Sequence, residues 1–262
     1  MGLGVLTVAL MSCLTAALTP LPITFETVVP LRADVSPTYL GVNIDTASVA
    51  EGMDFSNPSL RNLFKAIAPV KLRIGGTSSH GLTFTNAPSP PECIPNSVCL
   101  SSCCGNKTWR SEIFLSTTCM DSIGEFLVAT QTELLFNLAP TRLDPDSNNT
   151  HNPSAWNSTN SELLLAYIGK QSYSHLVTGL EVGNEQPTIT SGSQLGKDVL
   201  LAQTLAKKHG MAHVRTVGPS LPKRRPPPGW VDEYCAATHG KLDLFAVHEY
   251  LGVNCKNKSA GA

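Results

Sequence analysis

The sequence has few charges and few aromatic residues, and these shortages exclude several classes of protein. Charged residues make up 15% of the 262 residues and aromatic residues 6%. The formal net charge of -1 at pH 7 provides no overall attraction to nucleic acid, so no nucleic-acid partner is expected. Hydrophobic residues make up 42%, which is too many for an intrinsically disordered chain. The length suits one sizeable core or two small domains.

Long apolar runs are missing after residue 18. A membrane-spanning helix needs about 20 consecutive apolar residues, so we expect any membrane contact to be peripheral. Residues 1–18 are apolar, contain no acidic residue, and end in small residues. This pattern is typical of a signal peptide, although the usual basic residues at its start are absent. The sequence therefore predicts a secreted protein, in the extracellular space or the lysosomal lumen, whose folded part is 19–262.

Glycosylation sequons and cysteines favour the same compartment. Four Asn-X-Ser/Thr sequons begin at Asn106, Asn148, Asn157 and Asn257. Seven cysteines follow residue 18, and five of them lie within 93–119. Such crowding predicts disulfides in an oxidising compartment, with one cysteine left over because the number is odd. Zinc is the alternative, but the cluster has no CxxC pair that is matched by a second one or by a His pair.

Several motifs of enzyme chemistry are also missing. The chain contains no GxGxxG or P-loop for nucleotides, no GxSxG of serine hydrolases, no HExxH of zinc proteases and no DxDxDG calcium loop. These absences give no support to the corresponding enzymes and calcium-binding proteins. We expect no cofactor and no metal ion, and the chemistry that remains is that of carboxylates.

Strand-like and helix-like segments alternate along the chain. The expected strands are 39–45, 70–74, 133–139, 176–182, 214–218 and 243–250, and the expected helices are 56–68, 118–130, 160–171, 193–209 and 229–238. Strict alternation predicts an α/β fold with parallel strands. An open doubly wound sheet and a (β/α)8 TIM-type barrel both fit. The missing glycine-rich turn after the first strand favours the barrel, apparently incomplete with about six βα units, and with an insertion rich in Cys and Pro around 85–119.

In such a barrel the active site lies at the carboxyl ends of the strands. The polar or glycine residues at these ends are Asn43, Asp45, Gly75, Gly76, Thr77, His80, Asn137, Asn184, Glu185, Ser220, His248, Glu249 and Tyr250. Glu185 follows a buried strand in the segment LEVGNEQP, where a carboxyl group can serve as a general acid. Asn184 beside it can bind a sugar hydroxyl. The alternative for Glu185 is a structural role in capping the next turn.

These segments resemble the heparanase-like glycoside hydrolases of family 79. The most specific matches are LRIGGT, NSTNSELLLAY and GSQLGKD, and the resemblance extends from residue 36 to about residue 254. It implies a (β/α)8 barrel that cleaves β-glucuronide linkages with retention, in heparan sulfate or a related polysaccharide. By resemblance, Glu185 is the acid/base residue, and the predicted substrate-binding residues are Asn184, Gly75, Gly76, Thr77, His80, His248, Tyr250, Lys223, Arg224 and Arg225. The last three form a basic loop that suits sulfate or carboxylate groups, or is simply a solvated loop.

The chain departs from the family pattern at several of these positions. His80 stands where the family has an Asp, Gln186 displaces a Pro, and Leu180 replaces a Trp. None of its residues matches the family's nucleophile, so we expect a chain truncated before that residue. The alternative function is a non-catalytic secreted protein that binds glycans, or acts as a decoy, on the same partial barrel.

Overall fold

The main element of the chain is a six-stranded parallel sheet. The computed structural model describes residues 39–50, 52–88, 100–102, 113–141, 155–186, 190–222 and 226–248. The sheet has the strand order β1-β2-β6-β7-β8-β9, so each strand lies beside the next strand of the sheet along the chain. The strands are β1 (Gly41–Asp45), β2 (Lys71–Gly75), β6 (Glu133–Leu138), β7 (Val177–Val182), β8 (Arg215–Leu221) and β9 (Leu244–Val247). This half-barrel confirms the predicted α/β class and all six predicted strands.

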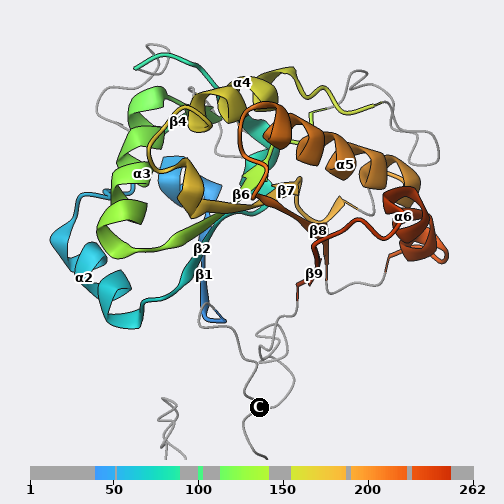
Figure 1. Cartoon of the computed structure of the whole chain (residues 1–262), viewed down its shortest axis with the longest axis horizontal. Helices are drawn as coiled ribbons and strands as arrows, with labels where there is room; N and C mark the ends of the chain where they lie inside the picture. Colours follow the sequence, from blue (N-terminus) through green and yellow to red (C-terminus); the bar gives the residue numbers. More distant parts are fainter. Residues whose placement is uncertain are drawn as a thin grey trace, which may run out of the picture. The chain divides into compact units, whose positions relative to one another are not determined.

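Helices connect these strands and form an arc around the sheet (Figure 1). They are α1 (Thr46–Ala50), α2 (Pro58–Ile67), α3 (Thr117–Thr130), α4 (Thr159–Ile168), α5 (Gly192–Lys208) and α6 (Trp230–Thr238), with 3-10 turns η1 (Thr77–Gly81) and η2 (Ser174–Leu176). Three of the helices are capped at the N-terminus by a side chain that accepts a hydrogen bond from a backbone N–H of the first turn. The capping residues are Asn57 before α2, Ser116 before α3 and Ser191 before α5. Pro58 follows Asn57 at a position where its missing N–H costs nothing.

The two faces of the sheet differ in polarity because alternate residues of a strand point to opposite sides. Leu72, Ile74, Leu134 and Phe136 are buried in the hydrophobic core, together with residues of α3, α4 and α5 such as Phe126. The alternate positions carry Lys71, Arg73, Glu133, Asn137 and Glu181. The second face is therefore polar, and it leads to the carboxyl ends of the strands.

The predicted insertion and the three residues before it form a second, smaller sheet that the sequence did not reveal. Strands β3 (Leu82–Phe84), β5 (Ile113–Leu115) and β4 (Leu100–Ser102) pair in the order β3-β5-β4. The Asn160 side chain of α4 accepts a hydrogen bond from the Phe84 N–H (2.7 Å) and donates one to its carbonyl (2.8 Å). These strands have three residues each, which is too short for an alternating pattern to stand out.

Several sequence predictions lie outside the described residues. They include the signal peptide, three of the four sequons and five of the seven later cysteines. Cys119 is buried at the start of α3, and Cys235 is exposed on α6. The disulfides, the glycosylation and the secretion therefore stay predictions. Within the described ranges, no helix has both the length and the apolarity needed to cross a bilayer.

Candidate active site

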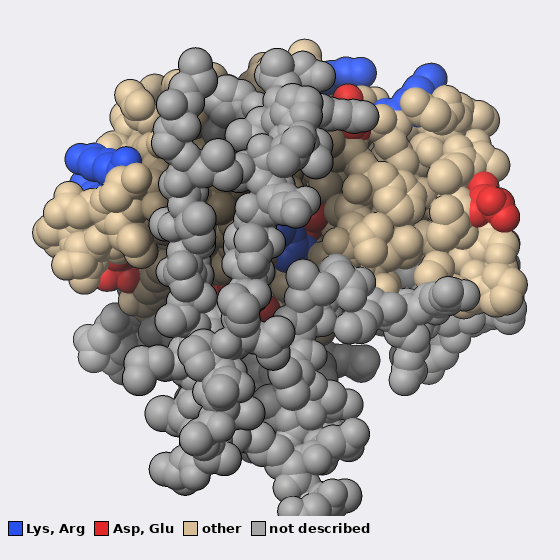
Figure 2. Space-filling view, turned by 90° about the horizontal axis from the view of Figure 1, so that it is seen from below, with Lys and Arg blue, Asp and Glu red and all other residues tan. Residues whose placement is uncertain are grey.

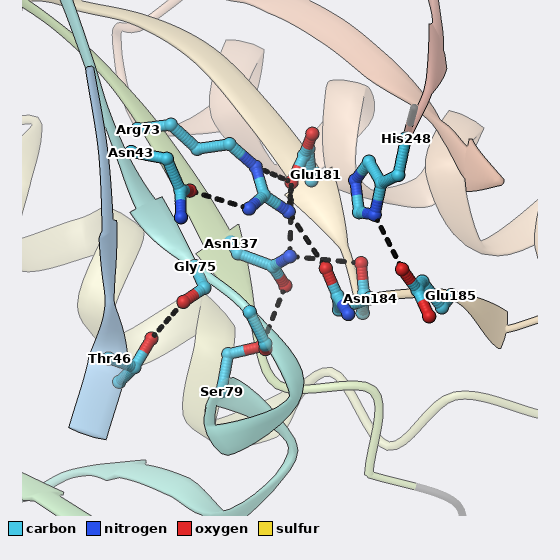
Figure 3. Close-up of polar contacts among 12 residues, drawn as sticks. Asn43, Thr46, Arg73, Gly75, Ser79, Asn137, Glu181, Asn184, Glu185 and His248 are labelled. Atoms are coloured by element: carbon cyan, nitrogen blue, oxygen red, sulfur yellow. Dashed lines mark hydrogen bonds and ion pairs between the residues drawn. The ribbon is translucent and has the colours of Figure 1, made fainter. Parts of the chain in front are cut away.

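The carboxyl ends of the strands bring together Gly75, Asn184, Glu185 and His248 among the predicted site residues (Figure 3). Gly75 ends β2, Asn184 and Glu185 follow β7, and His248 follows β9. In a parallel sheet these ends share one edge, as the predicted site requires. The close-up shows the residues converging from separate strands, with Arg73 and Glu181 beside them.

Glu185 occupies a turn that points its carboxyl group towards β9. Its Oε1 lies 2.8 Å from Nδ1 of His248, and its side chain is 29% exposed, so it is within reach of a ligand. The Glu185 N–H donates to the carbonyl of Ser220 at the end of β8 (3.1 Å). Its φ of 52° is in the left-handed region, which a residue with a side chain rarely adopts. Such strain is common at functional sites, where surrounding contacts maintain it.

Asn184 is buried beside Glu185, and its side chain has a partner at each end. Its Oδ1 accepts a hydrogen bond from Nη2 of Arg73 (3.0 Å), and its Nδ2 lies 3.4 Å from Oγ1 of Thr77. The second distance is long for a hydrogen bond, so a ligand hydroxyl can replace Thr77 at little cost. Arg73 thus fixes which end of the amide points towards a ligand.

Arg73 and Glu181 form a buried ion pair that the sequence analysis missed. Nε and Nη2 of Arg73 lie 2.9 and 2.7 Å from Oε2 of Glu181, and Nη1 donates to Oδ1 of Asn43 (2.8 Å). Asn137 on β6, the strand between them, donates to the same Glu181 oxygen (3.0 Å) and to the Gly183 carbonyl (3.0 Å). The signal in the sequence was two opposite charges, Arg73 and Glu181, within strands whose alternate residues are apolar.

Gly75 at the end of β2 and Gly76 after it lie where a side chain would collide with its neighbours. A Cβ on Gly75 would lie 3.0 Å from both Cζ of Arg73 and Cβ of Asn137. Gly76 has a φ of 104°, and a Cβ there would overlap the Asp45 carboxylate. The loop therefore packs tightly against the site residues. Contact of Gly75, Gly76 and Thr77 with substrate stays a prediction.

His80, predicted to bind substrate, contacts the main chain of the site. Its Nε2 lies 3.1 Å from the Asn184 nitrogen, 3.0 Å from the Asn184 oxygen and 2.9 Å from Nε2 of Gln186. Nε2 of His80 is therefore already in contact with the turn that carries Glu185. A substrate contact through Nε2 would require that turn to open.

Four predicted site residues lie outside the described residues, namely Lys223, Arg224, Arg225 and Tyr250. On the face shown in Figure 2, basic and acidic side chains of the described residues are dispersed over the tan surface. Among the residues that the structure describes, no group of three or more His, Cys, Asp or Glu side chains is arranged to hold a metal ion.

Comparison with known proteins gives a consistent set of relatives. A family model described as "Glycosyl hydrolase family 79, N-terminal domain" matches residues 38–235. Heparanase-like protein 3 of Arabidopsis thaliana is 27% identical over 225 residues, covering 81% of this chain and 39% of that protein. Heparanase of Mus musculus is 26% identical over 242 residues, covering 77% and 43%. This chain thus spans about two fifths of the length of these relatives.

Two further proteins are similar over part of their length. Baicalin-beta-D-glucuronidase of Scutellaria baicalensis is 29% identical over 148 residues, covering 51% of this chain and 27% of that protein. Among solved structures, a GH39 enzyme from Xanthomonas axonopodis pv. citri matches with a TM-score of 0.47 and 14% identity, covering 82% of this chain and 41% of that one.

Proposed function

The chain belongs to glycosyl hydrolase family 79, and we propose that Glu185 is the general acid/base residue of a retaining β-glucuronide hydrolase. The substrate we propose is a secreted or cell-surface polysaccharide such as heparan sulfate. The observation that carries the proposal is the placement of Glu185: a partly exposed carboxyl group at the carboxyl edge of the sheet, oriented by His248. Relatives named heparanase and β-D-glucuronidase support the substrate class.

The contacts of Glu185 suit proton transfer to a glycosidic oxygen. A general acid has to hold its proton close to the leaving oxygen and in one direction. His248 at 2.8 Å fixes one carboxyl oxygen, and the main-chain contact with Ser220 fixes the turn. The same carboxylate would then act as the base towards water in the second half of a retaining reaction.

Asn184 supplies the neighbouring polar group. Because Arg73 holds Oδ1, the Nδ2 group is directed towards Thr77 and can donate to a sugar hydroxyl. Hydrogen bonds to the sugar 2-hydroxyl that strengthen in the transition state contribute several kcal/mol in such enzymes. A retaining reaction also needs a nucleophilic carboxylate about 5–5.5 Å from the acid/base carboxyl. We assign that role to none of the described residues.

The test is hydrolysis by the full chain, expressed through a secretory pathway, with Glu185→Gln as the variant. The substrates are heparan sulfate, a 4-methylumbelliferyl β-glucuronide and a dinitrophenyl β-glucuronide. We expect the variant to lose about 10²–10⁴-fold in kcat/KM on heparan sulfate, where the leaving alcohol needs a proton. On the dinitrophenyl substrate, whose leaving group departs as an anion, the loss in kcat/KM should be much smaller, although kcat falls as well because the second step lacks its base.

A matched control is Glu162→Gln, which changes a carboxylate on α4 that pairs with Lys208. It should leave all three rates unchanged. Equal losses on all three substrates with Glu185→Gln would contradict the acid/base role. A folded wild-type chain that hydrolyses none of them does not suffice for turnover by itself, which agrees with the missing match to the family's nucleophile. If that chain also binds heparan sulfate, the result favours the alternative glycan-binding function.

A further inference from the structure

The side chains of His80 and Gln186 contact each other, and both contact the main chain of Asn184 next to the peptide bond that joins it to Glu185. Nε2 of Gln186 donates to the Asn184 carbonyl (3.1 Å) and lies 2.9 Å from Nε2 of His80. The Asn184 N–H donates to the same His80 nitrogen (3.1 Å). The Glu185 N–H donates to the carbonyl of Ser220. The carbonyl and the N–H of the Asn184–Glu185 peptide bond, and the N–H of Asn184 before it, therefore all have hydrogen-bond partners.

This arrangement is built around a close contact with Gly183. A Cβ added to Gly183 would lie 2.8 Å from Cδ and Cγ of Gln186, and Gly183 itself has a φ of 70°. Gln186 is buried, with 1% of its surface exposed. The amide is therefore confined against the main chain of the turn, where its hydrogen bonds are not exchanged with water.

We propose that His80 and Gln186 are positioning residues that hold the Asn184–Glu185 peptide and so fix the direction of the Glu185 carboxyl group. We call this pair the 80/186 clamp. Glu185 has a left-handed φ of 52°, which is unfavourable for a residue with a side chain and needs support from its surroundings. The inference rests on the proposed role of Glu185. The proposed role of both residues is to hold the main chain, and it is separate from the substrate contact that the sequence predicts for His80.

The clamp fixes the protonation of His80. The Asn184 N–H and the Gln186 amide nitrogen both lie within hydrogen-bond distance of Nε2, so the proposed clamp uses this nitrogen as an acceptor. His80 is then neutral, with its proton on Nδ1. The Asn184 oxygen, 3.0 Å from the same Nε2, takes its hydrogen bond from Gln186 instead.

The first test measures the clamp without substrate. In the full chain labelled with ¹⁵N in histidine, we expect long-range ¹H–¹⁵N spectra at pH 7 to show His80 with an unprotonated Nε2. Hydrogen exchange of the 183–186 amides should quicken about tenfold in Gln186→Leu, since this change removes two contacts and keeps the side-chain size. His80→Leu should have a similar effect, and the double variant should add little because both changes open the same clamp.

The control is Gln194→Leu, in which the lost hydrogen bond joins Gln194 to Asp198 within α5. It should leave the 183–186 amides unchanged. A protonated Nε2 in His80, or exchange at 183–186 that Gln186→Leu does not alter, would overturn the clamp. These measurements need no activity, so they stand even where the proposed function fails.

The second test measures the consequence for the reaction. In the dinitrophenyl and heparan sulfate assays, Gln186→Leu should lower kcat on heparan sulfate at least about tenfold and leave KM within twofold. It should change kcat/KM on the dinitrophenyl substrate far less. This split is expected because the clamp directs the proton donor and does not bind sugar. Equal losses on both substrates, or a loss confined to KM, would refute the positioning role.

Discussion

The ion pair between Arg73 and Glu181 should contribute more to stability than any exposed pair of this chain's described residues. In Arg73→Met, the Glu181 carboxylate stays 2% exposed and keeps only the hydrogen bond from Asn137. An uncompensated buried charge of this kind costs about 3–5 kcal/mol. For a chain of this size that lowers Tm by about 6–20 °C.

Neutralising the acid of the pair should lower the free energy of unfolding by less than removing the base. In Glu181→Gln, the Arg73 side chain is 19% exposed and keeps Asn43 and Asn184 as acceptors. We expect a loss of about 1.5–3 kcal/mol, as for one hydrogen bond to a charged group. The double variant should be more stable than the sum of the two losses predicts, by about 2 kcal/mol, because neither charge is then left alone.

The assay is equilibrium unfolding in urea, followed by the fluorescence of the buried Trp156 and Trp230. The control is Lys71→Met, which breaks a pair with Glu133 on the same face at 2.9 Å, where both side chains are about one third exposed. That change should cost about 0–1 kcal/mol. A loss below about 1 kcal/mol in Arg73→Met, or strict additivity in the double variant, would refute the reasoning.

Two further predictions concern the helical layer. Gly124→Ala should destabilise the chain by about 1–3 kcal/mol in the same assay, although alanine favours helices, because its Cβ would overlap the Tyr173 ring; a more stable variant would contradict this packing. Burial and the neighbouring Asp121 raise the pKa of Tyr167 from 10.0 to about 12. The unfolded chain therefore loses this proton first, so stability should fall as the pH rises from about 10 towards 12. In Tyr167→Phe, stability measured by urea titration at stepped pH should fall less steeply over this range than in the wild type. An unchanged slope of stability against pH would contradict the raised pKa of Tyr167.

The sequence allowed the large sheet to be predicted because its signals are local. Each of the six strands is a short apolar run next to a Gly, Pro or polar boundary, and helices such as α2 have caps that can be read directly, with Asn57 before Pro58. The short helix α1 and the three-residue strands of the small sheet carry too few residues for a period to emerge.

The site was predicted less completely than the fold. Residues at strand ends, such as Glu185 and His248, could be found because their position in a parallel sheet fixes where they meet. Arg73 lies within β2 and Glu181 within β7. Their pairing depends on the order of the strands in the sheet, where β6 alone separates β2 from β7. No local pattern in the sequence reveals that order. The contact of His80 with the main chain depends on the path of η1, which no local pattern reveals, and its substrate contact stays a prediction.

The distances along the chain between contacting site residues have a consequence for how the protein is made. Arg73 and Asn184 are 111 residues apart, and Glu185 and His248 are 63 apart. During synthesis, Arg73 is made long before Glu181 and Asn184, so β2 carries its positive charge for a time without the acid that pairs with it. Long-range pairings of this kind slow folding and lengthen the exposure of unpaired strands. The contacts of Glu185 can form only once His248, which follows β9, has been made.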